Sequence, residues 1–309
     1  MGKLDDKAWS VLLDRIQEGK CTPFLGAGVN DGILPLGRDI AEEWAKKYSY
    51  PLGDRSDLVR VAQFLAVTDP LFPKTQILKL LKGRLEKWLT QVDLEEFLKS
   101  PEQPLALLAD LPLPVYITTN YDDLLVRVLR NRHKDPEREL CCWNKYVRDK
   151  LEEQGRRSVF ESESGFEPTP EKPLVFHLHG HDEVPESVVI AEDDYLEFLV
   201  NISRNETLVP PRIQQAMANT SLLFVGYGLA DWNFRVLWKL LKSVDRQGQL
   251  INVAVQLRPG DPELNQQEAE EYLAKYFDSM KVQVYWGKAR NFAAELRDRW
   301  EHFKSEGGS

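Results

Sequence analysis

The chain alternates between short apolar runs and longer segments in which apolar residues recur at helical spacing. The short runs predict buried strands, because each is only about five residues long and ends at a polar or glycine-containing stretch. The six predicted strands are residues 21–25, 114–118, 174–178, 221–225, 250–255 and 282–285. Strands that alternate with helices predict an α/β fold, with a parallel sheet and helices on both of its faces.

Helical spacing predicts the elements between the strands. The expected helices are residues 5–18, 38–48, 121–129, 232–241, 264–277, a helix that starts at 193–194, and a final helix carrying Phe292, Leu296, Trp300 and Phe303. Residues 55–110 have helical spacing throughout, and we interpret residues 50–112 as a helical module inserted into the sheet domain. Residues 131–172 are charged and aperiodic, which predicts an irregular surface excursion. Residues 1–309 then form one domain, with a disordered tail at 305–309.

The acidic composition limits the kinds of partner. The net charge of −9 disfavours duplex DNA, because DNA binding needs a clustered cationic face. The one basic run, Arg127 to Lys134, is interpreted as the solvated end of a helix. No apolar run approaches the ~18 residues of a membrane span, and the polar N-terminus does not resemble a signal peptide. We therefore expect neither membrane binding nor direct binding of duplex nucleic acid.

Cysteine usage indicates a reducing compartment. The chain has three cysteines, Cys21, Cys141 and Cys142, and this set does not form a disulfide framework. No pair has CxxC spacing, which excludes a four-cysteine zinc ribbon. These features predict a cytoplasmic protein.

Two glycine-containing turns follow predicted strands. The first holds Gly26 and Gly28, and the second holds Gly226 and Gly228, with Asp231 after it. Glycines let the backbone approach a diphosphate closely, and the N-terminus of a following helix offers unpaired N–H groups. The full GxGxxG pattern is absent, so an ordinary tight turn is an equal alternative. Asp231 also has two interpretations, as a helix cap or as a partner of a ribose hydroxyl.

Polar side chains follow two further strands. Asn120 and Asp122 each fit either a helix cap or a ligand contact at the sheet edge where strand carboxyl ends meet. Alternate residues of a strand share a face, so His177, His179 and His181 are candidate metal ligands. A buried core histidine is the simpler alternative, above all for His177. His179, at the end of its strand, is best placed for general acid–base chemistry near neutral pH.

Four segments occur together in a characteristic order and spacing. They are Phe24-Leu25-Gly26-Ala27-Gly28-Val29, Thr118-Thr119-Asn120-Tyr121-Asp122, Leu178-His179-Gly180 and Leu223-Phe224-Val225-Gly226-Tyr227-Gly228-Leu229-Ala230-Asp231. This set resembles the SIR2-like (sirtuin-related) family, in particular the branch found in bacterial NAD-cleaving defence proteins. The resemblance covers roughly residues 20–245. It implies a Rossmann-like domain with a helical module and an NAD site between the two.

The resemblance also implies roles for single residues. Gly26, Ala27 and Gly28 would hold the diphosphate, and Asn120 would lie by the nicotinamide ribose and orient water. His179 would act on the ribose hydroxyls as acid and base. The other positions assigned to NAD+ binding are Val29, Asp122, Gly226, Tyr227, Gly228 and Asp231. The zinc-ribbon cysteines of protein-deacylating sirtuins are missing, so no zinc is expected and deacylation of acyl-lysine is disfavoured.

The leading functional hypothesis is an NAD+ glycohydrolase. NAD+ would be the substrate, nicotinamide and ADP-ribose the products, and bacterial antiphage defence the setting. Two alternatives remain open: a sensor or assembly module that binds NAD or ADP-ribose without catalysis, and transfer of ADP-ribose or acyl groups. The sequence suggests no sensor or membrane domain beside the SIR2-like part. We therefore expect control by homo-oligomer assembly or by a separately encoded activator or effector protein.

Overall fold

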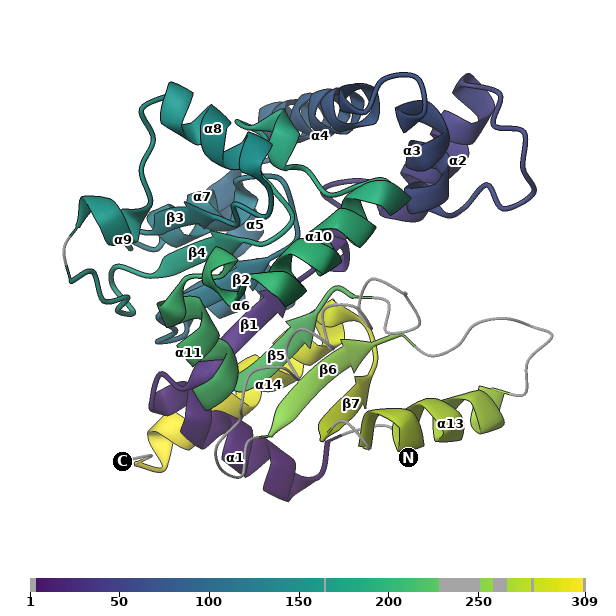
Figure 1. Cartoon of the computed structure of the whole chain (residues 1–309). Coiled ribbons are helices and arrows are strands. Elements are labelled where there is room, and N and C mark those ends of the chain that lie inside the picture. Colours follow the sequence, from purple (N-terminus) through teal and green to yellow (C-terminus); the bar gives the residue numbers. More distant parts are fainter. Residues whose placement is uncertain (1–3, 164, 228–250, 258–265, 279–280, 308–309) are drawn as a thin grey trace.

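The computed structural model describes residues 4–163, 165–227, 251–257, 266–278 and 281–307 (Figure 1). Its centre is a seven-stranded sheet with the order β3-β4-β2-β1-β5-β6-β7, in which all neighbouring strands are parallel. The strands are β1 (Cys21–Leu25), β2 (Val115–Thr118), β3 (Glu137–Leu140), β4 (Leu174–His177), β5 (Ser221–Val225), β6 (Asn252–Gln256) and β7 (Val282–Trp286). The predicted α/β class, a Rossmann-like parallel sheet between helices, is therefore confirmed.

The central strands are apolar because helices cover both of their faces. Every residue of β1, β2, β4 and β5 is buried. Parallel strands in this position have nearly continuous apolar runs rather than alternating ones. The register places Phe24 of β1 beside Ile117 of β2 and Phe224 of β5.

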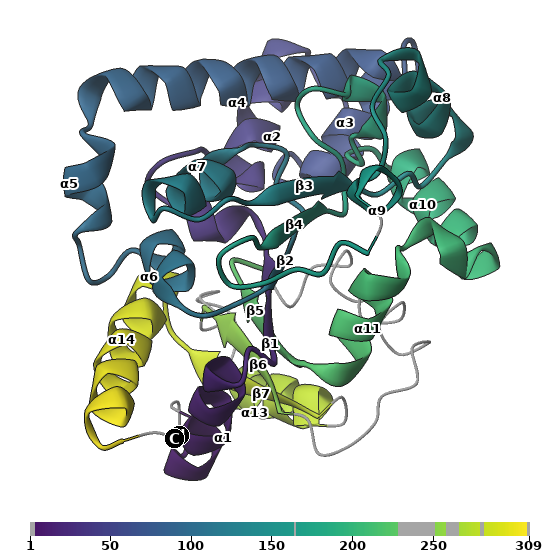
Figure 2. The same cartoon turned by 90° about the vertical axis from the view of Figure 1, so that its left-hand side faces the viewer.

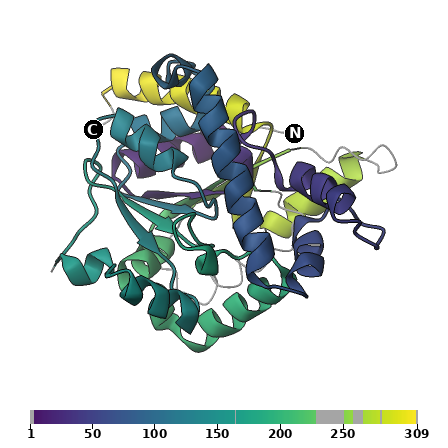
Figure 3. The same ribbon diagram turned by 90° about the horizontal axis from the view of Figure 1, so that it is seen from above.

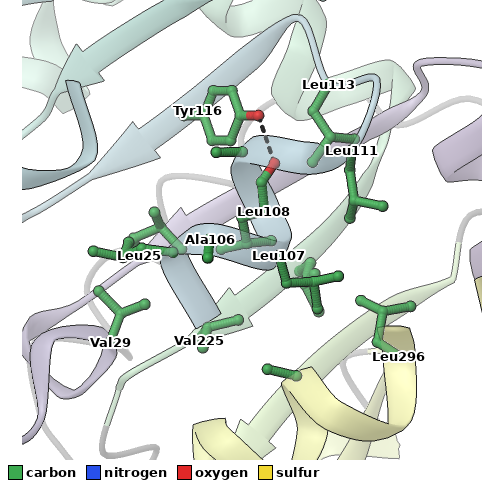
Figure 4. Packing of buried hydrophobic residues seen from close by; sticks show 14 of the residues in the cluster. Leu25, Val29, Ala106, Leu107, Leu108, Leu111, Leu113, Tyr116, Val225 and Leu296 are labelled. Atoms are coloured by element: carbon green, nitrogen blue, oxygen red, sulfur yellow. Dashed lines mark hydrogen bonds between the residues drawn. The ribbon is translucent and has the colours of Figure 1, made fainter. Parts of the chain in front are cut away.

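Separate apolar cores fill the two sides of the sheet (Figure 2). One side is covered by α1 (Asp6–Gln17), α6 (Pro104–Asp110), α7 (Leu124–Asn131) and α14 (Ala289–Ser305). The other is covered by α10 (Glu192–Arg204), α11 (Pro211–Asn219) and α13 (Gln266–Asp278). Figure 4 shows the first core, where the Tyr116 hydroxyl donates a hydrogen bond of 2.8 Å to the carbonyl of Leu108.

A third apolar cluster lies between three of the helices that precede β2 in the sequence. It unites α2 (Gly37–Lys47), α3 (Leu58–Ala66) and the first half of α4 (Leu71–Gln91), which crosses the molecule in Figure 3. Val188 and Ile190, from the loop before α10, complete this cluster. Residues 50–112, interpreted as an inserted module, thus divide between two cores, because α5 (Leu94–Leu98) and α6 pack onto the sheet instead.

A buried ion pair joins the helical cluster to the sheet domain. The Lys74 ammonium on α4 lies 2.6 Å from the carboxylate of Asp194 on α10, and both side chains are largely buried. The Lys74 ammonium also lies 5.4 Å from the ring centre of Trp143. Asp194 accepts hydrogen bonds from the N–H groups of Ile190 and Ala191, so the charge of the carboxylate is well satisfied.

Residues 131–172 contain more regular structure than the sequence pattern predicts. They include β3, α8 (Lys145–Glu153) and α9 (Val159–Ser162), and β3 pairs with β4 at the edge of the sheet. The sequence of β3 is Glu-Arg-Glu-Leu, so it has no apolar run to mark it as a strand. Glu139 is nevertheless buried, because its carboxylate accepts hydrogen bonds from Ser158 Oγ and Val159 N.

The remaining elements are short turns and the chain end. Three 3₁₀ turns are present: η1 (Ala27–Asn30), η2 (Pro185–Ser187) and η3 (Glu206–Leu208). Helix α14 includes Ser305, the first residue of the predicted tail, and residues 308–309 lie outside the described part. Among the described helices, none combines the length and the apolar character that a bilayer span requires.

Candidate active site

The sheet topology fixes where a ligand can bind. Apart from the edge strand β3, the order β4-β2-β1-β5-β6-β7 is that of a doubly wound sheet. From β1 the chain adds β2 and β4 on one side and β5, β6 and β7 on the other, so the switch point lies between β1 and β5. Ligands of such sheets bind in the crevice outside the strand carboxyl ends at this switch point. A cavity of about 1200 Å³ lies there. Its walls include these predicted site residues: Gly26, Ala27, Gly28, Val29, Asn120, Asp122, His179, Gly226 and Tyr227.

Two predicted site residues and one predicted helix cannot be placed. Gly228, Asp231 and the helix expected at 232–241 lie outside the described residues. Arg38 lies at the cavity wall, where its exposed guanidinium pairs with Glu42 at 3.0 Å.

The two glycine turns pack directly against each other at the switch point. The N–H of Gly26 donates to Val225 O and the N–H of Gly28 donates to Gly226 O, both over 2.9 Å. Gly226 has a φ of +85°, and a Cβ there would lie 2.3 Å from Val29 N. A side chain at Gly26 would likewise meet Gly226 O at 2.7 Å. Glycine is therefore required here for loop packing, whatever ligand the turns hold.

A short 3₁₀ turn separates the first glycine turn from the helix expected at 38–48. The glycine turn leads directly into the four-residue η1, so no α-helix begins at the predicted diphosphate site. The expected helix is α2, which begins at Gly37. A single 3₁₀ turn aligns few peptide dipoles, so any diphosphate contact here depends on individual groups of the loop.

Hydrogen bonds fix Asn120 on two neighbouring strand ends. Its Nδ2 donates to Gly26 O over 3.2 Å, and its N–H donates to Thr118 Oγ1 over 3.0 Å. Its carbonyl accepts a hydrogen bond of 3.1 Å from His177 Nδ1. The amide of Asn120 is thus held at the cavity wall by β1, β2 and β4 together.

His179 faces the cavity from the end of β4 and is surrounded by aromatic rings. The centres of the Tyr195 and Phe198 rings, both on α10, lie 5.3 and 5.1 Å away with their planes nearly perpendicular to the imidazole. Burial lowers the pKa of His179 to about 3, so the imidazole is neutral at pH 7. Its Nε2 is buried and has no hydrogen-bond partner within the described part of the chain.

Asp122 is a partly buried carboxyl group that also lines the cavity. Its Oδ1 accepts from Leu124 N over 2.9 Å, which satisfies the start of α7 as the capping alternative predicts. Its Oδ2 lies 3.1 Å from Asn30 Nδ2. Burial raises the pKa of Asp122 to about 6. The Oδ1 of Asn30 has no partner among the described residues, and with the amide flipped it would accept a hydrogen bond from the protonated carboxyl of Asp122.

Sequence reasoning missed one tyrosine that shapes this site, Tyr121, and it assigned Tyr227 to NAD+ binding without a structural role. The Tyr121 hydroxyl donates to Val189 O over 2.8 Å and so ties the Asn120 loop to the segment after His179. The Tyr227 hydroxyl donates to Leu25 O over 3.1 Å, across the switch point. Both residues lie inside the motifs already singled out, but an aromatic residue there carries no signal that separates a structural hydroxyl from a ligand contact.

Comparison with known proteins identifies the family. A model of the SIR2-like domain matches residues 114–280, which is more than half of the 309 residues. The chain belongs to the SIR2-like family. This SIR2-like chain also aligns with a solved structure described as "Structural Basis for the Mechanism and Regulation of Sir2 Enzymes", with a TM-score of 0.39 and 14% identity, over 98% of this chain and 100% of that one.

Curated relatives of this SIR2-like chain are named NAD(+) hydrolase ThsA or Defense-associated sirtuin 2. NAD(+) hydrolase ThsA of Acinetobacter baumannii (strain 532279) is 22% identical over 249 residues, 77% of this chain and 43% of the relative. ThsA of Bacillus cereus (strain MSX-D12) is 22% identical over 238 residues, 76% and 42% of the two chains. Defense-associated sirtuin 2 of Bacillus subtilis is 27% identical over 135 residues, 42% and 11%. The chain thus spans less than half the length of these relatives.

Proposed function

We propose that the cavity hydrolyses NAD+ to nicotinamide and ADP-ribose. The observation that carries this proposal is the convergence of the Asn120 amide, the neutral imidazole of His179 and the glycine turns on one cavity at the switch point. Its volume of about 1200 Å³ exceeds the ~300–1000 Å³ of most small-ligand pockets, as a dinucleotide requires. The names of the ThsA relatives favour the same activity.

The proposed reaction breaks the bond between the ribose C1′ and the nicotinamide nitrogen. Nicotinamide leaves with the bonding electrons, the ribose becomes oxocarbenium-like, and water adds to C1′ with loss of one proton. The fixed amide of Asn120 would orient this water, since an amide offers both donors and an acceptor. Preorganised dipoles around the cavity would stabilise the charge that develops in the transition state.

The neutral state of His179 suits a base rather than an acid. A buried imidazole whose pKa is about 3 has a lone pair at pH 7 and accepts a hydrogen bond from a ribose hydroxyl. The carboxyl of Asp122, with its pKa raised to about 6 by burial, is a group of the cavity wall that can exchange a proton near neutral pH. We assign it to substrate binding close to the reacting ribose.

The other assignments are part of the same proposal. Gly26, Ala27, Gly28 and Val29 would lie along the diphosphate, and Gly226 and Tyr227 near the adenosine half. We further propose that the activity serves antiphage defence in the cytoplasm. Homo-oligomer assembly or a separate activator protein would switch it on, because uncontrolled loss of NAD+ would harm the host.

The test is nicotinamide release from NAD+ by the wild type, His179→Ala and the matched control His302→Ala, over a range of protein concentrations. His302 is exposed on α14, far from the cavity wall. Release by the wild type and the control, but not by His179→Ala, supports hydrolysis at this site. A steep dependence on protein concentration supports control by assembly. Stoichiometric NAD+ binding without release would instead indicate a binding module.

A further inference from the structure

A second group of titratable side chains lies behind the cavity. Asp123, His177 and His181 each offer one ligand-type atom, and these atoms all lie within 4.8 Å of one another. The ring centres of His177 and His181 are 4.6 Å apart. His179 is not part of this group, because it faces the aromatic rings of α10. Two of the three histidines noted in the sequence therefore converge, with an aspartate as the third member.

The tautomer of His177 is determined by its neighbour. A carbonyl only accepts hydrogen bonds, so the contact to Asn120 O places the proton on Nδ1. In the neutral ring, a proton on Nδ1 leaves a lone pair on Nε2. This Nε2 is buried and finds no donor among the residues that the structure describes. A metal ion binds this form of histidine, with the second nitrogen donating to a carbonyl.

His181 is placed in a similar way. Its Nε2 lies 3.0 Å from Asp123 Oδ1, and its Nδ1 lies 3.2 Å from Asp182 Oδ1. The Nδ1 accepts a hydrogen bond of 3.2 Å from Glu183 N, which places the proton on Nε2, facing Asp123 Oδ1. A metal ion at Nε2 would replace this proton, and the ring would then carry its proton on Nδ1, beside the Asp182 carboxylate. The spacing of about 3 Å between the nitrogen and the carboxylate oxygen is that of two ligands with metal bonds of about 2 Å.

A cation already occupies this position. The Nη1 of Arg138, on the edge strand β3, lies 3.0 and 2.9 Å from the two carboxylate oxygens of Asp123. It also lies 3.2 Å from His181 Nε2. The Arg138 side chain is one-quarter exposed and already reaches Glu183 at 3.3 Å through Nη2. The guanidinium can therefore turn toward Glu183 at the surface while the Asp123 carboxylate keeps its charge.

We propose that Asp123, His177 and His181 form a binding site for a divalent transition-metal ion of the zinc class, which enters in exchange for the Arg138 guanidinium. Two imidazole nitrogens and one carboxylate oxygen are borderline ligands, which suit zinc and cobalt better than calcium or magnesium. A second cavity, of about 260 Å³, is lined by Asp123, one member of the group. Its acidic wall residues are Glu86, Asp122, Asp123, Asp182 and Glu183.

The position of this site gives it a regulatory consequence. Metal bound at His177 Nε2 would polarise the ring and strengthen the bond from Nδ1 to Asn120 O. The Asn120 loop after β2 and the His181 loop after β4 would then be held by one ion. The metal would act by positioning Asn120 and would not contact the substrate cavity itself, which His177 and His181 do not line.

The experiment is a titration of chelator-treated full-length protein with Co²⁺, followed by visible absorption. We expect one Co²⁺ per chain with the intense bands of a low-coordinate site, and displacement by Zn²⁺. Arg138→Ala removes the competing cation and should bind Co²⁺ roughly tenfold or more tightly. Asp123→Asn and His181→Gln should each lose the bands. The matched histidine control His179→Ala should keep them, since this ring faces away from the group.

Circular dichroism of each variant verifies the fold, and the gain expected for Arg138→Ala is informative even if a loss variant fails to fold. Folded wild type and Arg138→Ala that both lack the Co²⁺ bands would overturn the proposal. So would bands that persist in His181→Gln or vanish in His179→Ala, because the ion would then bind elsewhere. None of these readouts depends on NAD+ hydrolysis, so they test the metal site separately from the proposed activity.

Discussion

Two histidines that follow strand β4, His179 and His181, lie in contrasting environments. On the cavity side, His179 lies between aromatic rings, and no described group pairs with its Nε2. On the far side, His181 lies between the carboxylates of Asp123 and Asp182, beside the guanidinium of Arg138. The first environment leaves a neutral ring available for a substrate. The second environment consists of charged side chains that pair with the imidazole, and it lies behind the cavity.

The difference arises from one backbone turn. β4 ends at His177, and Gly180 has a φ of +101°, so the chain leaves the strand direction within three residues. A Cβ at Gly180 would lie 2.4 Å from Ser187 O, which restricts the position to glycine. The alternation of a strand, which placed all three histidines on one face in the sequence analysis, therefore does not extend beyond His177.

The largest expected effect is a loss of activity without a loss of the fold, and it concerns the cavity side. His179→Ala should lower NAD+ hydrolysis by roughly 10²–10⁴-fold, because it removes the proposed acid–base group, while the fold remains intact. Nicotinamide release and the thermal midpoint are the two measurements, with His302→Ala as the control. Turnover within about threefold of the wild type would place the chemistry at another residue.

On the far side, the expected loss is in stability. Asp123→Ala leaves Arg138 and His181 without their shared carboxylate, and it should lower the free energy of unfolding by about 2–3 kcal/mol, less than a fully buried pair because Asp123 is partly exposed. Urea denaturation measures this loss. Glu18→Ala, which removes the exposed contacts to Arg15 and Lys20, should leave the free energy of unfolding nearly unchanged and serves as the control. Equal losses for the two variants would contradict a special role for the cluster.

Asp122 and His179 should contribute to the free energy of unfolding with opposite dependences on pH. The pKa of Asp122 is raised from 3.8 to about 6 on folding, so its contribution is fully present below pH 3.8 and is lost as the pH rises through 6. The pKa of His179 is lowered from 6.5 to about 3, so its contribution is present above pH 6.5 and is lost as the pH falls toward 3.

Asp122→Asn isolates the first of these contributions. At pH 7 it removes the cost of a buried carboxylate, and it should raise the free energy of unfolding by up to about 3 kcal/mol relative to the wild type. At pH 3.5 the difference should nearly vanish, because the wild-type carboxyl is then neutral. Urea denaturation at both pH values checks this. The same stability difference at pH 3.5 and pH 7 would show that the carboxyl does not change its charge in this range.

The smallest expected effect concerns the bond that ties the two loops together. Tyr121→Phe removes the hydrogen bond to Val189 O and should lower the free energy of unfolding by about 1 kcal/mol. Tyr146→Phe, at an exposed position on α8, is the control and should change nothing measurable. Thermal or urea unfolding of the pair decides whether the hydroxyl of Tyr121 stabilises the segment that follows His179.

The sequence predicts most of the sheet but only part of the site. The six apolar runs correspond to β1, β2, β4, β5, β6 and β7, since burial on both faces requires continuous apolar residues. The edge strand β3 is missed, because Glu139 is satisfied by Ser158 and Val159, which lie too far along the chain to be read from a local pattern. The motif residues converge on one cavity as expected, because strand carboxyl ends share an edge.

The cluster behind the site could not be found from spacing. Asp123 and Arg138 are separated by a helix and belong to different strand ends, and His177 and His181 meet only because the chain turns at Gly180. The pKa values of Asp122 and His179 likewise depend on burial, which is a property of the folded chain.

The ion pair between Lys74 and Asp194 also bears on how the cavity is filled. Swinging α4 away from α10 would separate this ion pair and would also expose the apolar contacts of Ile77 and Leu78 with Ile190 and Ala191. Because α4 and the start of α10 both line the cavity, we expect this wall to keep its position when a ligand binds.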